Sequence, residues 1–213
     1  MAGSDEVKLL GGWPSPFVMR PRIAFNLKSI PYDYLDENFR AKSDLLLKSN
    51  PVHKKVPFSS TTAARVASGA GRGGDRNYRF RPRRLQDKIV KARRAEAKDE
   101  ALEKTKVALK RIEELFKDFS KGEKFFGGVG IGYLDIVVGS YLGWVRMAET
   151  IITKVKLLNK EKMPELVGWV ERFCAHEAVK DVMPEIHMLI DFAKELLSKP
   201  TSKPNCEIEK GPN

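Results

Sequence analysis

Short apolar runs separated by turns occupy the first quarter of the chain and predict a small α/β unit. Val7–Trp13 and Tyr32–Glu37 each fit a strand, and Phe17–Lys28 places apolar side chains on one face of a helix. Ser43 can cap a further short helix that runs through Leu47. This strand–helix–strand–helix order predicts the first half of an α/β domain with a parallel pair of strands.

The second half of the chain has helical spacing throughout. From Leu85 to Phe119 apolar residues recur at three- and four-residue intervals while Glu and Lys fill the opposite face, which predicts an amphipathic helix. Leu134–Thr150 is apolar on nearly all sides and predicts one central, buried helix. Further helices are expected near Met163–His176 and Pro184–Leu197, so residues 85–197 are predicted to form an all-α domain. The apolar stripe of the first of these helices comprises Leu102, Thr105, Leu109, Ile112, Leu115, Phe116 and Phe119.

The stretch at residues 58–84 follows neither pattern. It is built largely from Ser, Thr, Ala, Gly and Arg, and Val66 is its single large aliphatic residue. A segment of this composition buries too little apolar area to offset the entropy of ordering it, so we predict that it is flexible and contains no strand. The tail at residues 198–213, which is rich in Lys and Pro, is expected to be disordered.

The net charge of +11 is concentrated in one part of the chain. Residues 58–94 hold nine Arg and two Lys against two Asp, or +9, which leaves +2 for the remainder of the 213 residues. Arg residues interleaved with two aromatic side chains are typical of RNA-binding segments. A nucleic-acid-binding fold, however, spreads its basic patch over several elements, so nucleic-acid binding is disfavoured.

Bulk composition predicts a soluble protein of the reducing cytosol. Hydrophobic residues make up 42% of the chain and charged residues 31%. No apolar run reaches the roughly 18 residues that a membrane span requires, and the N-terminus lacks an apolar signal core. Two cysteines are too few for a disulfide framework. No His, Cys, Asp and Glu residues have metal-ligand spacing, so neither a metal nor another cofactor is expected.

Several longer motifs follow one another in a fixed order. Trp13–Phe17 (WPSPF) and Leu45–Pro57 (LLLKSNPVHKKVP) resemble the active-site motif and the second signature of the plant tau class of glutathione transferases. The resemblance covers about residues 7–57 and 85–197. It implies a thioredoxin-like N-terminal domain, of which residues 1–57 form an incomplete part, and an all-helical C-terminal domain. It also implies a cytosolic homodimer active in detoxification and stress responses. The later motifs that agree are Ser120–Gly128, Ile131–Asp135 and Trp169–Phe173.

Ser15 is the candidate catalytic residue that this resemblance implies. The transfer reaction needs the thiolate of glutathione, whereas a free thiol, with a pKa of about 8.5, is mostly protonated at neutral pH. A serine hydroxyl at a helix N-terminus can donate a hydrogen bond to the sulfur anion, and the positive end of the helix adds to this stabilisation. A serine before a proline is also a common helix cap. The five-residue motif alone favours the cap, and the second signature reverses that preference.

The rest of the glutathione site is implied by the same resemblance. The backbone of Val56 would pair with the cysteinyl part of glutathione, as an added strand does, and Pro57 would be cis. Lys42 and Lys55 would bind the glycine carboxylate of glutathione, which is a co-substrate and not a cofactor. Without the resemblance, each lysine would be interpreted as a solvated surface charge.

Three further residues have candidate roles. Phe17 and Phe192 could line a pocket for a small hydrophobic electrophile, although ordinary core packing is the alternative for each. Asp135 lies three residues after Gly132, the spacing of a capping box at the start of the predicted central helix. We therefore assign Asp135 to folding and not to catalysis.

The chain departs from the family after Pro57. There the family continues into two antiparallel strands and a helix that opens with a Glu–Ser pair, which holds the γ-glutamyl end of glutathione. Here an Arg/Gly/Ala-rich stretch takes that place, no Glu–Ser pair occurs, and Glu is absent from residues 58–94. The stretch resembles translation of another reading frame or of a retained intron, a hypothesis that sequencing the transcript would test. Two functions stay open: a transferase acting on hydrophobic electrophiles, or a catalytically impaired transferase-like binding or scaffold protein.

Overall fold

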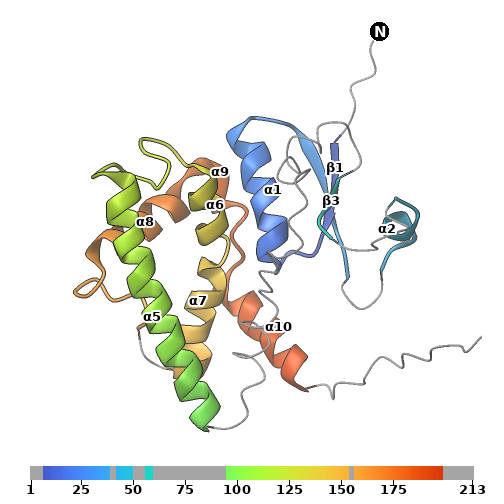
Figure 1. The fold of residues 1–213 in the computed structure, drawn as a ribbon. Coiled ribbons are helices and arrows are strands. Elements are labelled where there is room, and N and C mark those ends of the chain that lie inside the picture. Colours follow the sequence, from blue (N-terminus) through green and yellow to red (C-terminus); the bar gives the residue numbers. More distant parts are fainter. Residues whose placement is uncertain (1–6, 39–41, 50–55, 60–94, 154–155, 199–213) are drawn as a thin grey trace, which may run out of the picture.

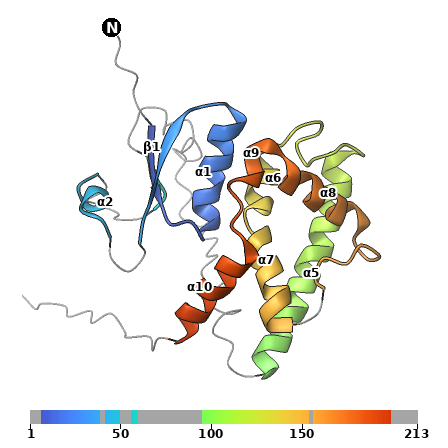
Figure 2. The same cartoon turned by 180° about the vertical axis from the view of Figure 1, so that it is seen from behind.

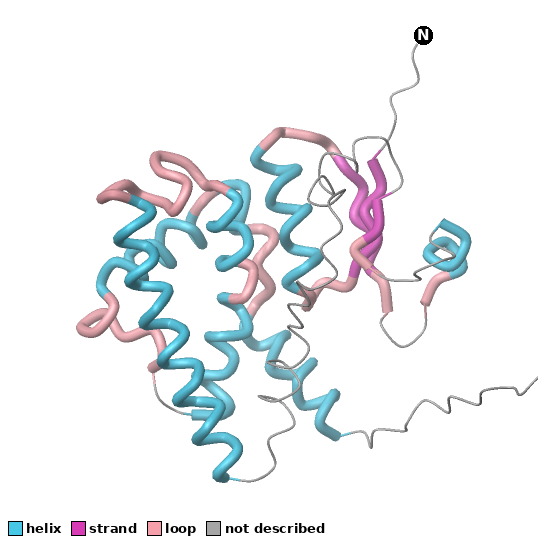
Figure 3. Tube along the Cα trace, in the orientation of Figure 1, coloured by secondary structure: helices cyan, strands magenta, loops and turns pink. Residues whose placement is uncertain are grey.

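The strands lie on one side of the molecule and most helices on the other (Figures 1 and 3). The computed structural model describes residues 7–38, 42–49, 56–59, 95–153 and 156–198. Helix α1 (Pro16–Leu27) lies between the sheet and the helical domain. Seen from behind, α2 (Asp44–Ser49) lies on the outer side of the strands, away from α1 (Figure 2). Helix α1 therefore meets both parts of the molecule.

Within the described residues, three strands form a sheet in the order β2-β1-β3. The central strand β1 (Val7–Gly11) pairs in parallel with β2 (Tyr32–Asp36), which confirms the predicted parallel pair. Strand β3 (Phe58–Ser59) pairs with β1 in the antiparallel sense. The prediction that no strand follows Pro57 is therefore wrong for the first two residues after it. Pairing to the open edge of β1 uses backbone groups, which side-chain composition does not report.

Helix α1 joins two hydrophobic cores. Its residues Met19 and Ile23 are fully buried in the same cluster as the core of the helical domain. Phe25, on another face of α1, packs with Val7 and Leu9 of the sheet. A proline at the first helical position is favourable, because its fixed φ suits the helix and its missing N–H would be unpaired there. Burial on both faces fixes α1, and with it the turn from which it starts.

The helix after β2 begins as predicted. Ser43 precedes α2, and its hydroxyl oxygen accepts a hydrogen bond from the Leu46 amide at 3.1 Å. This is the side-chain bond of an N-cap, so the predicted cap is confirmed. The helix runs through Leu47, as predicted, and ends at Ser49.

The helical domain agrees with the predicted helices except for one additional helical turn and an interruption in the central apolar segment. The predicted helix that begins at Met163 is α8 (Pro164–Ala175), and the last predicted helix is α10 (Ile186–Ser198). The sequence pattern did not predict α9 (Glu177–Lys180), a single turn whose cap is His176. The amphipathic helix is described from residue 95 as α5 (Ala95–Ser120), and the predicted residues 85–94 lie outside the described part of the chain.

The apolar stripe of α5 is only partly buried. Leu109 and Phe116 belong to the main core, but Leu115 and Phe119 are 48% and 55% exposed. These two side chains share the helical spacing of the stripe but lie at its margin. Spacing alone therefore overestimated the width of the buried face.

The central apolar segment is interrupted and is not one helix. It forms α6 (Tyr133–Gly139), α7 (Leu142–Ala148) and a π-helical turn at Glu149–Thr153. At the interruption the Ser140 hydroxyl donates to the Val137 carbonyl at 2.9 Å, and the backbone resumes as α7. The predicted segment is also not buried throughout, because Leu134 at its start is 40% exposed.

Asp135 connects three parts of the helical domain. Its carboxylate accepts hydrogen bonds from the backbone amides of Phe126, Gly127 and Gly132 at 2.9, 2.9 and 2.8 Å. It also accepts from the indole nitrogen of Trp169 on α8 at 2.6 Å, and it is fully buried. These contacts hold structural elements together, as expected from the capping-box spacing.

Candidate active site

Ser15 stands at the N-terminus of α1, directly after the turn that leaves β1. Its φ of −83° and ψ of 120° are the extended values of an N-cap residue. Its amide donates to the Gly12 carbonyl at 3.1 Å, which closes the turn, but its side chain makes no capping hydrogen bond. The capping role that the sequence left open is therefore not the role of this hydroxyl. The α1 amides beyond it carry the positive end of the helix dipole.

The ends of the two neighbouring strands flank this turn. Gly11 pairs with Asp36 on β2, and Leu10 pairs with Phe58 on β3. Because β3 is antiparallel to β1, the residue before Phe58 lies beside the end of β1. The Val56–Pro57 peptide bond at that position is cis, as the resemblance implies. Sheet topology thus brings the second predicted motif to the turn that carries Ser15.

A polar network on β2 holds the start of the turn. Because side chains alternate along a strand, Tyr34 and Asp36 lie on one face of β2. Asp36 Oδ1 accepts from the Trp13 amide at 3.0 Å and from the Tyr34 hydroxyl at 2.9 Å. The Tyr34 hydroxyl also lies 2.5 Å from the Gly11 carbonyl oxygen. Burial, followed by the adjacent Asp36 carboxylate, raises the pKa of Tyr34 well above its usual range, so the hydroxyl keeps its proton.

Aromatic residues from both domains meet beside the turn. The Phe192 ring on α10 lies 5.7 Å from the Trp13 ring and 6.5 Å from the Trp144 ring on α7, centroid to centroid. The Trp144 indole nitrogen donates a hydrogen bond to the Pro14 carbonyl at 2.8 Å. We call Trp13, Trp144 and Phe192 the aromatic cluster. All three side chains are half-buried, so part of their apolar surface is accessible.

The remaining predicted residues are spread around this centre. Phe17 is half-buried on α1, and the guanidinium carbon of Arg20 lies 4.8 Å from its ring centroid. Lys42 is exposed just before α2, and Val56 is half-buried. Lys55 lies outside the described residues. The structure therefore places Ser15, Pro57 and Phe192 around one turn and leaves Phe17 in contact with Arg20.

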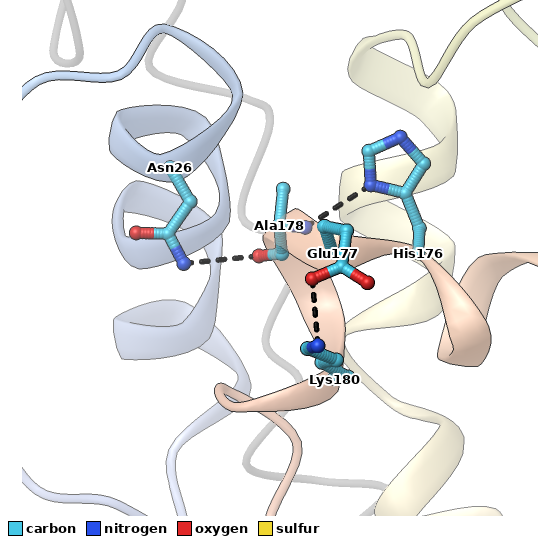
Figure 4. A network of polar contacts seen from close by, with 5 residues as sticks. All are labelled: Asn26, His176, Glu177, Ala178 and Lys180. Carbon is cyan, nitrogen blue, oxygen red and sulfur yellow. Dashed lines mark hydrogen bonds and ion pairs between the residues drawn. The ribbon is translucent and has the colours of Figure 1, made fainter.

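The opposite end of α1 is attached to the helical domain by a separate set of polar contacts (Figure 4). The Asn26 amide donates to the Ala178 carbonyl at 3.1 Å, and His176 Nδ1 accepts from the Ala178 amide at 3.1 Å. Glu177 pairs with Lys180 at 2.6 Å. A shallow surface hollow lies over this junction, lined in part by Asn26 and Glu177. These contacts fix the orientation of α1 from the end that is remote from Ser15.

Two general properties of the described residues bear on the chemistry. None of the described helices is long and apolar enough to cross a membrane. Within the same residues, no group of three or more His, Cys, Asp and Glu side chains is placed to hold a metal ion.

Comparison with known proteins identifies the family. Residues 5–58 match the family "Glutathione S-transferase, N-terminal domain", and residues 75–177 match "Glutathione S-transferase, C-terminal domain". Glutathione S-transferase U17 of Arabidopsis thaliana is 43% identical, covering 94% of this chain and 99% of its own length. The crystal structure of a tau class glutathione S-transferase from mango is 42% identical, with a TM-score of 0.77 over 90% of this chain and 98% of its own. The chain belongs to the tau class of glutathione S-transferases.

The fold of this tau-class protein agrees with the prediction. Both family matches and the mango structure support a thioredoxin-like N-terminal domain followed by a helical domain. A rice GST1 structure in complex with glutathione has a TM-score of 0.73 at 24% identity, over 92% of this chain and 99% of its own. At that level of identity the similarity supports the fold alone.

Sequence reasoning missed Asp36, Trp13 and Trp144 as parts of this tau-class site. Trp13 stands inside the active-site motif, and its position two residues before Ser15 could have indicated it. Trp144 is 129 residues from Ser15 in the sequence, as 144 minus 15 gives, and lies in an apolar segment that predicted only core. Nothing in its local pattern separates it from a packing residue.

Proposed function

We propose that this tau-class chain is an active glutathione transferase that joins the glutathione thiolate to small hydrophobic electrophiles, as in detoxification. One observation carries the proposal: Ser15 stands at the N-terminus of α1 with a side chain that makes no capping hydrogen bond. A hydroxyl that is not used for capping is free to serve a ligand. The aromatic cluster beside the same turn supplies an apolar surface for the second substrate.

The role of Ser15 is to favour the ionised form of the glutathione thiol. Its hydroxyl donates a hydrogen bond to the sulfur, and a hydrogen bond to the charged form lowers a pKa. The positive end of α1 acts in the same direction. The thiol proton leaves for solvent, and the thiolate attacks the electrophilic carbon. In a substitution the new carbon–sulfur bond replaces the bond to the leaving group. In an addition the π bond breaks, and the neighbouring carbon takes a proton from solvent. Ser15 remains unmodified throughout.

The remaining contacts to glutathione follow from the motif after α2. The Val56 backbone pairs with the cysteinyl part, and the cis Pro57 turns the chain so that this backbone faces the ligand. Lys42 and Lys55 bind the glycine carboxylate. Lys42 is exposed and precedes α2, which is compatible with a contact to a ligand at the surface of the domain.

The electrophile lies against the aromatic cluster. Phe192 meets Trp13 at an interplanar angle of 66° and Trp144 at 79°, the edge-to-face arrangement that aromatic pairs favour. Phe17 lies two residues after Ser15 and extends the apolar surface. The half-buried state of these rings leaves area for a ligand to cover, and burial of apolar area drives such binding.

A specific feature of the sequence favours a second candidate function, a transferase-like binding or scaffold protein that has lost turnover. The Glu–Ser pair expected to hold the γ-glutamyl group is absent, and residues 58–94 contain no Glu. Each lost charge-assisted contact costs about 1.5–3 kcal/mol, so two would weaken glutathione binding by two orders of magnitude or more. Residues 60–94 lie outside the described part of the chain.

Calorimetric titration with glutathione, on wild type and Ser15→Ala, separates these functions. Conjugation assays on a panel of electrophiles accompany it. Millimolar or tighter binding by wild type, with conjugation reduced about a hundredfold or more in Ser15→Ala, is the expected result. Ser29→Ala is the matched control, because Ser29 is an exposed serine at the opposite end of α1. Tight glutathione binding by wild type would contradict the impaired binding or scaffold protein. No detectable binding would contradict the active transferase and would favour a scaffold that is a transferase by descent only.

The assembly and location proposed here follow from the tau-class family. The chain acts as a cytosolic homodimer, and neither membranes nor nucleic acids are partners. Exposed apolar side chains on α5, among them Leu115 and Phe119, offer surface for a second copy. Light scattering at several protein concentrations tests the dimer, and a monomer at all of them would contradict it.

A further inference from the structure

Five hydrogen bonds hold the backbone of the turn that carries Ser15. The Gly11 carbonyl accepts from the Glu37 amide and from the Tyr34 hydroxyl. The Ser15 amide donates to the Gly12 carbonyl, and the Trp13 amide donates to Asp36. The Trp144 indole donates to the Pro14 carbonyl. The first four lie entirely within the N-terminal domain. The fifth comes from α7 of the helical domain and spans 130 residues of sequence. Trp144 thus gives the turn a hydrogen bond from the helical domain, in addition to the ring contact between Phe192 and Trp13.

The place of this fifth bond in the turn connects it directly to Ser15. The Pro14 carbonyl belongs to the peptide unit that joins Pro14 to Ser15. A peptide unit is planar, so an oxygen held at 2.8 Å fixes the orientation of the whole unit. That orientation sets the φ angle of Ser15, on which the preferred rotamer of its side chain depends. A displacement of the hydroxyl donor by a few tenths of an ångström changes the strength of its hydrogen bond to a charged group such as a thiolate.

A tryptophan can do this where a phenylalanine cannot. Its indole N–H is a hydrogen-bond donor, whereas the ring of phenylalanine has none. The contact of Trp144 with Phe192 is an edge-to-face contact that a smaller ring could keep in part. Pro14 is buried, so its carbonyl has limited access to water if the indole is removed. The ring and the N–H therefore have separable roles.

We propose that Trp144 is a positioning residue, whose indole N–H, by holding the Pro14 carbonyl, sets the direction of the Ser15 hydroxyl toward the glutathione sulfur. The helical domain thereby controls thiol ionisation in the other domain. This inference rests on the proposed transferase function. Trp144 does not itself touch the sulfur, and its effect passes through the Pro14–Ser15 peptide unit.

Trp144→Phe in the full-length protein is the test, because it removes the N–H and keeps an aromatic ring. We expect the pKa of bound glutathione, followed by ultraviolet absorbance of the thiolate, to rise by about 0.5–1 unit. At pH values well below the pKa of the bound thiol, this lowers the thiolate fraction about three- to tenfold, and the pH profile of kcat/KM shifts upward equally. Trp13→Phe is the matched variant: it also shrinks a ring against Phe192, but the Trp13 indole donates to no described residue. It should change the KM for the electrophile without shifting the pH profile.

A double-mutant comparison shows whether the effect passes through Ser15. In a Ser15→Ala background, Trp144→Phe should leave the pKa of the bound thiol unchanged, because the hydroxyl that it positions is gone. An unshifted pH profile in Trp144→Phe alone would overturn the proposal. So would an equal shift in the Ser15→Ala background, since Trp144 would then act by another route.

Hydrogen exchange in the free protein provides a readout that needs no glutathione. We expect peptides covering the turn at residues 11–15 to exchange at least about threefold faster in Trp144→Phe than in wild type or Trp13→Phe. Unchanged exchange would refute the positioning role. A wild type that binds no glutathione, with a turn loosened in Trp144→Phe, would contradict the proposed function and retain the role of Trp144 in placing Ser15.

Discussion

Replacing Asp135 by asparagine tests how far one carboxylate holds the helical domain together. Oδ1 accepts from the Phe126 amide at 2.9 Å and the Trp169 indole at 2.6 Å. Oδ2 accepts from the Gly127 amide at 2.9 Å and the Gly132 amide at 2.8 Å. An asparagine of the same shape keeps one oxygen, and its NH2 group faces two donors in place of the other. At least two of the four hydrogen bonds are therefore lost.

The structure gives the size of the effect. Hydrogen bonds to a charged group contribute about 1.5–3 kcal/mol each, so the loss of two predicts a decrease of about 3–6 kcal/mol in the free energy of unfolding. Asp135 is 0% exposed, so water cannot replace the lost acceptor without opening the core. Typical domains are stable by about 5–15 kcal/mol, which makes this a large fraction of the total.

Urea denaturation followed by far-ultraviolet circular dichroism and by tryptophan fluorescence measures this change. Trp169, one of the three tryptophans, is itself one of the donors, so part of the fluorescence signal reports on this contact. Asp118→Asn is the control: it makes the same chemical change at an exposed position of α5, and we expect a change within about 0.5 kcal/mol. A loss below about 1 kcal/mol in Asp135→Asn would refute the reasoning, since the carboxylate would then be replaceable by an amide.

Three further predictions concern the helical domain. Gly139→Ala would bring a β-carbon within 2.2 Å of the Phe173 ring, and we expect thermal unfolding to show a loss of stability of about 1–3 kcal/mol. At Gly130 an added β-carbon would meet nothing within 4 Å, so Gly130→Ala should be nearly neutral. Equal effects of the two substitutions would contradict the packing argument. Glu113 on α5 is buried, and its carboxylate accepts a hydrogen bond from the Leu166 amide of α8 at 2.6 Å. Glu113→Gln removes the charge and should lower the free energy of unfolding by about 1–3 kcal/mol in urea denaturation. An unchanged midpoint would show that other contacts hold α5 and α8 together. Burial raises the pKa of the Cys174 thiol, so in a Cys206→Ser background its alkylation by iodoacetamide should reach half its limiting rate at a higher pH than a free thiol does. The pKa of this thiol is higher in the folded than in the unfolded protein, so the thiol stabilises the fold below a pH of about 8.5. That contribution is lost as the pH rises through the folded-state pKa. Alkylation with the pH dependence of a free thiol would refute both statements.

Local patterns predicted the elements whose stability is local. The parallel pair β1–β2, helix α1 and the Ser43 cap of α2 follow from apolar spacing and from one capping residue, and each occurs where expected. The spacing of Asp135 after Gly132 likewise indicated a carboxylate that receives a backbone amide at a helix start. In α1, at the Ser43 cap and at Asp135 the interacting groups lie within a few residues of each other. The strands β1 and β2 are farther apart in sequence but are joined by one helix, which is the usual connection between parallel neighbours.

Predictions that depended on distant partners were less accurate. Apolar spacing predicted one central helix, but the chain breaks at Ser140, whose hydroxyl accepts a hydrogen bond from Arg20 on α1 at 3.3 Å. The same spacing predicted that Phe119 is buried, yet it is 55% exposed, because no described element covers that margin of α5. Composition predicted no strand after Pro57, but β3 forms there by pairing with β1.

The candidate site divides in the same way. The sequence by itself determined the position of Ser15 at a helix start, the motif that carries Pro57, and the family to which both belong. Only the tertiary structure decided that Asp36 and Trp144 hold the turn before Ser15, and that Phe192 completes an aromatic surface beside it. Helix starts and caps depend on backbone groups a few residues apart, which a linear pattern records. Contacts across 130 residues depend on how two domains pack, and packing energy is decided by the whole core and not by any one segment.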